Sequence, residues 1–398
     1  MRDRPRALLL YASGMPRPRR VAADTLRRFV PTPLARALSS SSIRYVRSVF
    51  AEEYESLSYV VDWRDAFVAS DEIDSVTCNV NDVVALAAVS RHITEFDLIV
   101  ALHSAAGDSL MQVERSRSAL SRRRGRLLVF FGNEYDDMAA KRALLRDVAA
   151  EYVGSQLPIE AARWLYEGCG STVLAAPAAL NPIVYRPGPA DRSVDIGFRG
   201  DRYASALIGD DERARIIEYF EHDGPARGLR VDIAFIRLPR REWSRLLARS
   251  VGTIGAEAGT YYLERDDTTR DRAARYIAAH PRAPLLEVLE RCYPPRPARM
   301  SGKAISSRHL EAVGTKTCQL LVRGSYNGIL HAGEHYIAVT PDLGNIEDAI
   351  RRFGDGAERR RIVESAYEMA MDAHTYAQRV RSILAVVLAG HGSSARAG

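Results

Sequence analysis

The sequence predicts an α/β protein with two doubly wound parallel-sheet domains that face a cleft. Short apolar runs alternate with helix-length segments in both halves, a pattern typical of parallel strands covered by helices on both faces. A proline-rich segment without periodicity, residues 177–192, separates the two halves. The length of 398 residues also favours two domains over one. We therefore expect an N-terminal domain at residues 1–186, a C-terminal domain at 187–375, and a final helix with a disordered tail at 376–398.

The first half contains seven segments that we expect to be strands. They are residues 7–12, 58–63, 75–80, 96–104, 126–134, 152–156 and 172–177. Residues 21–57 are compatible with helix, although Pro31 and Pro33 interrupt them. Further helices are expected from Asp82, near residue 120, after residue 134 and from residue 159.

The second half repeats the alternation. The expected strands are residues 194–200, 229–236, 251–259, 318–322 and 335–339. The expected helices are residues 210–222, 241–250 and 304–313, followed by an almost wholly helical region at 346–388. In open parallel sheets, ligands bind beyond the carboxyl ends of the strands, so we expect a site in the cleft between the domains.

Composition excludes several classes of protein. An apolar content of 46% and a charged content of 27% are ordinary for a globular protein. The four cysteines are scattered without C-x-x-C spacing, which favours reduced thiols and argues against structural zinc. The N-terminal apolar run is too short for a secretory signal, and no window approaches the roughly 18 apolar residues of a membrane span. We therefore expect a cytoplasmic protein.

The net charge of +6 is unevenly distributed. Residues 1–50 hold eleven arginines against Asp3 and Asp24, which gives this region a charge of +9. Such a region favours peripheral contact with an anionic membrane, although a solvated arginine-rich surface is an equal alternative. Nucleic acid is not predicted, because aromatic residues are not interleaved with the basic ones.

Missing motifs narrow the chemistry further. The chain has no P-loop, no G-x-G-x-x-G after the first strand and no H-E-x-x-H. It also has no Asp-x-Asp, the usual metal clamp of single-domain sugar transferases, so we expect no metal cofactor. Residues 107–110 match an esterase nucleophile motif, but Asp372 and His374 have the wrong spacing to complete it.

The stretch from residue 300 to residue 342 carries the main functional prediction. It has a loop, helix and strand order that places a helix N-terminus over a ligand. Arg308 and Glu311 lie three residues apart on one helix face, where the arginine suits a phosphate and the carboxylate suits ribose hydroxyls. The chain has only three lysines, and Lys303 and Lys316 both fall here, which favours a diphosphate site over chance placement on a loop.

Other candidates follow the strands of both halves. His103 ends one strand and could serve as a general base, although a structural role is the alternative. Asn133 and Glu134 end the next strand and could bind hydroxyls or cap a helix.

Candidates also follow strands in the second half, among them Gly255, Glu257 and Gly259, of which Glu257 could instead cap a turn. Gly200 and Arg202 come directly after a strand, so Arg202 could reach a phosphate. Tyr326 belongs to a turn and could also stack on a base.

Residues 306–321, 324–342, and 181–187 together with 194–200 resemble the GT-B superfamily of glycosyltransferases, in its group 1 type with a spore-maturation-protein-like C-terminal domain. The resemblance implies two Rossmann-like domains and a nucleotide-diphosphate-sugar donor. Arg308 and Glu311 match the R-x-x-E donor motif, in which the glutamate binds ribose. Lys303 stands where retaining members often have a glutamate, and Lys316 stands where the family has a glycine. These two departures predict a donor pocket that is more basic than usual.

The sequence therefore predicts a metal-independent hexosyltransferase that acts on a saccharide or lipid-linked acceptor in cell-surface glycan synthesis. Lys303 and Arg308 would neutralise the departing diphosphate, with His103 across the cleft near the acceptor. The nucleotide sugar is the donor substrate, and no cofactor is expected. Two alternatives stay open: a nucleotide-sugar epimerase, and a non-catalytic binding or assembly protein of the same fold.

Overall fold

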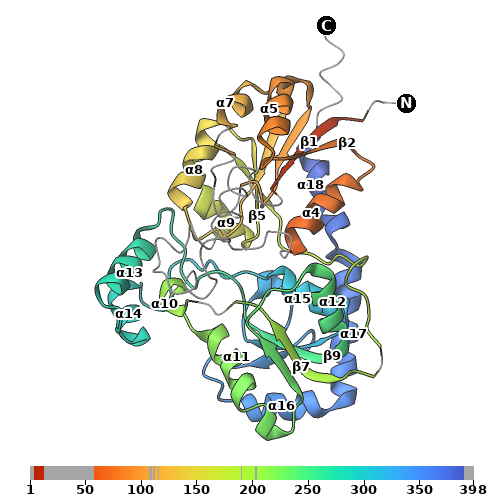
Figure 1. Cartoon of the computed structure of the whole chain (residues 1–398), viewed down its shortest axis with the longest axis vertical. Coiled ribbons are helices and arrows are strands. Elements are labelled where there is room, and N and C mark those ends of the chain that lie inside the picture. The colour runs from red at the N-terminus through yellow and green to blue at the C-terminus, as the bar shows by residue number, and fades with distance from the viewer. Residues whose placement is uncertain are drawn as a thin grey trace, which may run out of the picture.

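A computed structural model describes residues 4–12, 58–106, 110, 113–114, 116–189, 191–201 and 204–389. The described chain forms two lobes, each built on its own parallel sheet (Figure 1). The predicted fold class is confirmed. The expected helix at 21–57, the segment 107–109, Arg202 and the tail from residue 390 lie outside the described residues.

The first sheet has the order β2-β1-β3-β4-β5-β6, and every neighbouring pair is parallel. Its strands are β1 (Arg6–Tyr11), β2 (Asp74–Asn79), β3 (Leu98–Ala101), β4 (Arg126–Phe130), β5 (Tyr152–Ser155) and β6 (Thr172–Ala175). Its helices are α4 (Ser58–Val68), α5 (Val83–Arg91), the short η2 (Ile93–Glu95), α7 (Arg117–Arg122), α8 (Met138–Asp147) and α9 (Ile159–Tyr166). Asp82 caps α5 as expected, because its carboxylate accepts hydrogen bonds from the Val84 and Ala85 N–H groups.

The second sheet has the order β11-β10-β9-β7-β8, again with parallel pairs. Its strands are β7 (Val194–Arg199), β8 (Val231–Ala234), β9 (Ser250–Gly255), β10 (Cys318–Val322) and β11 (Ile337–Val339). Its helices are α10 (Ser205–Ile208), α11 (Glu212–His222), η3 (Pro225–Arg227), α12 (Arg240–Arg249), α13 (Thr268–Ala279), α14 (Leu285–Cys292), α15 (Ser307–Gly314), η4 (Tyr326–Gly328), α16 (Ile346–Gly354) and α17 (Gly356–Ala373). The chain order reverses between β7 and β9, so their carboxyl ends form the switch point of this sheet.

One predicted strand is wrong. Residues 58–63 begin helix α4. The local run of valines and aromatic residues favoured a strand, whereas the buried residues Val60, Trp63 and Phe67 recur at helical spacing. Packing against the sheet therefore decided this element rather than local propensity.

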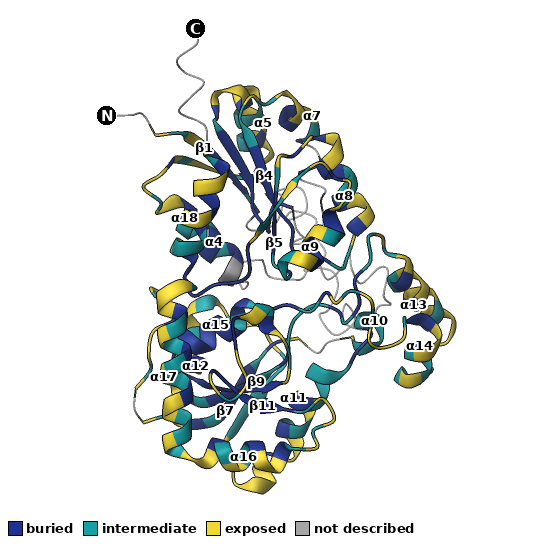
Figure 2. Ribbon diagram, turned by 180° about the vertical axis from the view of Figure 1, so that it is seen from behind, coloured by how far each residue is buried: buried dark blue, intermediate teal, exposed yellow. Residues whose placement is uncertain are grey.

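Both sheets bury residues on their two faces. Figure 2 colours the strands by burial. In β1, Leu8 and Leu10 enter the core beneath α5, α7, α8 and α9, while Ala7 and Leu9 face the opposite core. This alternation explains why the strands read as continuous apolar runs in the sequence.

The C-terminal helix α18 (Tyr376–Val387) packs on the N-terminal lobe. Its residues Val380 and Leu384 lie in one core cluster with Leu9 and Val100 of the first sheet. Between α17 and α18 the chain crosses back to the N-terminal lobe beside the proline-rich segment. Two backbone hydrogen bonds join them there: the Leu180 N–H donates to the His374 carbonyl at 2.8 Å, and the Tyr376 N–H donates to the Leu180 carbonyl at 3.0 Å. The predicted boundaries at 186 and 375 stay predictions.

Helices α13 and α14 project from the side of the molecule (Figure 1). They follow β9 and precede α15 along the chain, and the sequence did not predict them. The base of this projection is closed by an antiparallel bridge, in which the Ala258 and Ala304 N–H groups and carbonyls pair at 2.8 and 2.9 Å. It also contacts the N-terminal lobe, where Arg270 Nε lies 3.1 Å from Asp136 Oδ1 and Asp267 Oδ1 accepts from the Met138 N–H at 3.2 Å. The projection therefore touches both lobes.

Within the described residues, none of the helices is both long enough and apolar enough to cross a bilayer.

Candidate nucleotide-sugar site

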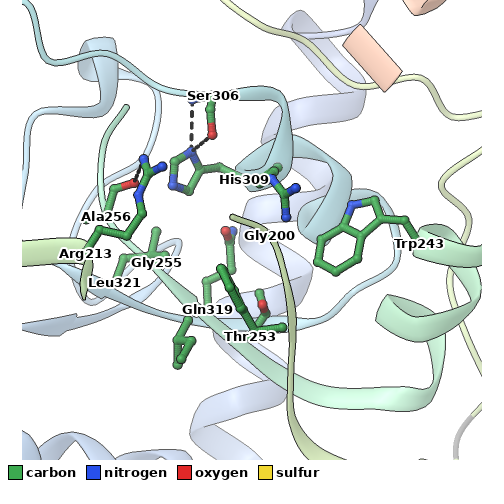
Figure 3. Close-up of a pocket in the computed structure, with 13 residues that line it drawn as sticks. Gly200, Arg213, Trp243, Thr253, Gly255, Ala256, Ser306, His309, Gln319 and Leu321 are labelled. Carbon is green, nitrogen blue, oxygen red and sulfur yellow. Dashed lines mark hydrogen bonds between the residues drawn. The ribbon is translucent and has the colours of Figure 1, made fainter. Parts of the chain in front are cut away.

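The first pocket opens at the carboxyl ends of β7 and β9, against the first turn of α15. It encloses about 450 Å³, counting the part open to solvent. Its lining residues are Phe198, Gly200, Arg213, Trp243, Thr253, Ile254, Gly255, Ala256, Ser306, Arg308, His309, Gln319 and Leu321 (Figure 3). The pocket lies at the switch point of the second sheet, where open parallel sheets bind ligands.

Arg308 lines this pocket, and its role toward a phosphate stays a prediction. Its guanidinium lies over the Trp243 ring, 5.0 Å from the centroid, and donates a hydrogen bond to the Arg199 carbonyl. Gly200 lines the same wall, and a Cβ built there would come within 2.9 Å of Phe198 Cζ. A glycine at this position therefore leaves room for the Phe198 ring and for Arg308 behind it.

Glu311 lies one turn further along α15 and is only 2% exposed. Its carboxylate accepts a hydrogen bond from Trp243 Nε1 at 2.6 Å. The side chain therefore sits behind the arginine and the indole and does not line this pocket. Its role toward ribose stays a prediction, while its visible role is to hold Trp243.

Arg213 was not predicted. Its guanidinium donates to the carbonyls of Ala256 at 3.0 Å and Glu257 at 2.8 Å, which fixes it beside the end of β9. The acidic run that opens α11 suggested only a helix start, so nothing in the sequence separated Arg213 from surface arginines. Together with Arg308 it gives the first pocket two cationic side chains.

His309 was also not predicted as a site residue. Its Nδ1 accepts a hydrogen bond from the Ser306 N–H at 3.0 Å, so the neutral ring carries its proton on Nε2. Burial lowers the pKa of His309 to about 3, which keeps the imidazole uncharged at neutral pH. The ring therefore offers the pocket shape and a neutral polar edge.

A second pocket of about 340 Å³ adjoins the first, because Arg213 lines both. Its other lining residues are Tyr135, Ser205, Ile208, Asp210, Ala214, Glu257, Gly259 and Lys303. Tyr135 comes from the N-terminal lobe and the rest come from the C-terminal lobe. Lys303 lies here, and its Nζ is 2.8 Å from Asp210 Oδ2 and 3.3 Å from Glu212 Oε2.

These ion pairs correct the expectation of a strongly basic pocket. Lys303 is balanced by two carboxylates. Lys316 lies beyond the C-terminal end of α15, the end opposite the pocket, where it pairs with Glu364 and lies 4.7 Å from the Tyr367 ring centroid. Lys316 therefore lines neither pocket, and its predicted contact with the diphosphate is wrong.

Tyr326 does not present its ring to a ligand. Its side chain is fully buried, its hydroxyl donates to Val322 O at 2.6 Å, and its ring packs edge-on against His309 at 5.0 Å. The predicted stacking on a base is replaced by support of His309 from behind.

The candidates of the N-terminal lobe are held in structural contacts. His103 is 1% exposed between the rings of Trp63 and Phe130, with centroids at 5.8 and 5.0 Å, and burial lowers its pKa to about 3. An acceptor could reach His103 only if these rings moved. Its role as a base therefore stays a prediction that the burial argues against.

Glu134 and Asn133 differ in exposure. The Glu134 carboxylate is buried and accepts hydrogen bonds from Ser155 Oγ at 2.6 Å, the Tyr166 hydroxyl at 2.8 Å and the Gln156 N–H at 2.9 Å. These donors occupy it, although burial raises its pKa. Asn133 is exposed and its Oδ1 accepts a hydrogen bond from the Tyr135 hydroxyl at 3.3 Å, and its predicted contact with ligand hydroxyls stays a prediction.

Two lobes, each built on a parallel sheet, with a pocket at the switch point of the second sheet, form the arrangement of the GT-B fold. Residues 246–385, most of the C-terminal lobe and α18, match the family described as glycosyl transferase-like. The resemblance expected from the sequence is confirmed at this level. No curated protein matches the chain.

One solved structure superposes on this chain with a TM-score above 0.5, and two others fall just below that value. An α-glucosyltransferase in complex with UDP and a 13-mer DNA superposes with a TM-score of 0.53 at 9% identity, over 96% of this chain and 99% of its own. HepE from Anabaena, in complex with UDP and glucose, gives 0.48 at 12% identity over 96% and 99%. The β-glucosyltransferase of phage T4 gives 0.49 at 8% identity over the same shares. At 9% identity, the superposition on the α-glucosyltransferase shows a shared fold and nothing finer.

Across the described ranges, no three His, Cys, Asp or Glu side chains form a group that could hold a metal ion.

Proposed function

We propose that the chain transfers a sugar, of hexose type, from a nucleoside-diphosphate-sugar donor to a saccharide or lipid-linked acceptor in cell-surface glycan synthesis. One observation carries the proposal: Arg213 and Arg308 converge on one pocket beside the N-terminus of α15, inside the region that matches the glycosyl transferase-like family. Two arginines and the positive end of the α15 dipole suit a diphosphate.

The reaction follows from this arrangement. The bond between the anomeric carbon and the outer phosphate oxygen breaks, and the nucleoside diphosphate leaves with the electron pair. The acceptor hydroxyl oxygen forms the new bond to the anomeric carbon and releases its proton to water. Arg213, Arg308 and the α15 dipole stabilise the negative charge that grows on the diphosphate.

Because these groups supply positive charge, we propose that transfer needs no metal ion. Addition of EDTA to a working assay should leave turnover unchanged. Loss of turnover that Mg²⁺ or Mn²⁺ restores would contradict this part of the proposal.

The main test pairs binding with turnover. The full chain is titrated calorimetrically with UDP, GDP and their sugars, and is then assayed with saccharide, lipid-linked and DNA acceptors. We expect micromolar binding of one nucleoside diphosphate and sugar transfer to a saccharide or lipid-linked acceptor. Conversion of the donor sugar without an acceptor would favour the epimerase. Binding without any conversion would favour the non-catalytic protein, and failure of all nucleotides to bind would remove the proposal.

We also propose that the protein is cytoplasmic and contacts anionic membrane through residues 1–50, most of which lie outside the described residues. The +9 charge of this region supports the proposal. Full-length protein should sediment with vesicles that contain phosphatidylserine and should be released by 0.5 M salt, as expected at a Debye length of about 4 Å. Equal sedimentation with neutral vesicles would contradict it.

A further inference from the structure

The second pocket continues the first one beyond Arg213. Since Arg213 lines both, a diphosphate bound against it from the first pocket would direct the next group of the donor into the second. In a nucleotide sugar that next group is the sugar. This inference therefore rests on the proposed function and deepens it.

The charged groups of the second pocket are fixed before any ligand arrives. The side chains of Asp210 and Lys303 are only 5% and 12% exposed, and their ion pair spans 2.8 Å. Glu212, the second partner of Lys303, is itself 3.2 Å from Arg296 NH1 through its other oxygen. Lys303 is thus held as one member of a network and has little freedom to turn toward a new anion.

The carboxylate of Glu257 is held in a similar way. Its Oε1 accepts hydrogen bonds from the Tyr326 N–H at 2.6 Å and from the Ser325 hydroxyl at 3.0 Å. Asp210 and Glu257 therefore give the pocket fixed acceptors, which match the hydroxyl donors of a sugar.

Among the described residues that line the pocket, both cations are already engaged. Lys303 serves Asp210 and Glu212, and Arg213 is directed to two carbonyls and to the proposed diphosphate. A carboxylate on the sugar would face Asp210 and Glu257, and like charges brought together in a partly buried site are costly.

We propose that the second pocket, with Asp210, Glu257 and Lys303, holds the donor sugar and selects an uncharged, hydroxyl-rich sugar against a uronate. Asp210 and Glu257 accept hydroxyl hydrogen bonds, and Lys303 keeps Asp210 in place.

Calorimetry with matched donors tests this. Wild-type protein is titrated with UDP, UDP-glucose and UDP-glucuronate, and with GDP, GDP-mannose and GDP-mannuronate. For the nucleotide that binds, we expect the uncharged sugar form to bind at least about tenfold more tightly than the uronate form, a difference that one unfavourable buried charge contact can supply.

Two variants locate the effect. Lys303→Met should weaken binding of the uncharged sugar form about tenfold, because the buried Asp210 carboxylate loses its ion-pair partner, and should change binding of the free diphosphate less than about twofold. Asp210→Asn keeps the shape and should narrow the ratio between the two sugar forms. Lys316→Met is the matched control, because that lysine lies at the far end of α15, and it should change none of these values.

The outcomes separate the two proposals. If no nucleoside diphosphate binds the wild type, the proposed function fails. If a nucleoside diphosphate binds but both sugar forms bind equally, or if Asp210→Asn weakens the free diphosphate as much as the sugar form in a protein with unchanged thermal unfolding, the sugar pocket is refuted and the function stands.

Discussion

The carboxyl edges of the two sheets carry similar polar residues in different states. At the carboxyl edge of the first sheet, Glu134 and His103 are buried in contacts with their own lobe. Lys141 is also fully buried there, and its Nζ donates hydrogen bonds to the Gly132, Asn133 and Asp136 carbonyls at 2.7–3.0 Å. At the carboxyl edge of the second sheet, Arg213, Arg308 and Lys303 also contact neighbouring residues, but they line the two pockets. A polar residue after a strand can thus stabilise a loop or serve a ligand, and its contacts decide which.

This comparison gives its largest predicted effect at Glu134. Glu134→Ala leaves the buried donors of Ser155, Tyr166 and Gln156 without an acceptor, so the free energy of unfolding should fall by about 3 kcal/mol. Donor affinity of the folded fraction should not change. Urea unfolding and calorimetry measure the two quantities.

The matched control is Glu160→Ala, since the Glu160 side chain is 75% exposed and should contribute less than about 0.5 kcal/mol. A Glu134 variant that unfolds like wild type but loses donor affinity would place Glu134 in the ligand site and break the comparison.

Arg308→Ala should give the next largest effect. Loss of one charge-assisted contact to a phosphate, worth about 2 kcal/mol, corresponds to roughly thirtyfold weaker binding of the nucleoside diphosphate. Calorimetric titration measures it.

Arg215→Ala is the control from α11, because Arg215 is 41% exposed and pairs with Asp211 at 3.1 Å. Equal affinity in wild type and Arg308→Ala would remove Arg308 from the phosphate site.

Trp243→Phe sharpens the comparison by testing a residue that acts through others. The change keeps an aromatic ring beneath Arg308 and removes the N–H that Glu311 accepts, so nucleotide affinity should fall about tenfold. Trp164→Phe, in the N-terminal lobe, is the control for the same substitution elsewhere.

The salt dependence of nucleotide binding distinguishes a positioning role of Trp243 from a purely structural one, because a purely structural role would leave it unchanged. If Trp243 positions Arg308, the variant should bind nucleotide with a weaker dependence on salt than wild type. An unchanged affinity and salt dependence would show that Arg308 holds its position without Trp243.

The smallest predicted effect concerns pH. Burial lowers the pKa of His103 to about 3, below its ordinary value of 6.5, so between these values the unfolded chain binds the extra proton and stability falls as pH falls. At pH 5.5 this amounts to about 1 kcal/mol relative to pH 7.5.

His103→Phe should remove that share of the acid sensitivity and leave nucleotide binding intact, as measured by urea unfolding at both pH values. His309→Asn should remove a similar share and also weaken nucleotide binding, because His309 lines the first pocket. Equal effects of both variants on binding would contradict the difference between the two edges.

The sequence by itself determined the two parallel sheets, because apolar runs separated by helix-length segments report local periodicity and burial on both faces. It also located Arg308 and Gly200 at the carboxyl edge, since both follow from strand ends and helix starts. The sequence did not predict the helix at residues 58–63, because valines and aromatic residues favour strands locally. Only packing on the first sheet made this segment helical.

Only the tertiary structure decided what each charge does. Lys303 finds Asp210 and Glu212 about ninety residues earlier in the chain, and Glu311 finds Trp243 sixty-eight residues away. The strength of such pairs depends on distance and burial in three dimensions, which no spacing in the sequence reports. For the same reason the sequence could not distinguish Arg213 from the other arginines. Its place in the pocket depends on contact between the start of α11 and the end of β9.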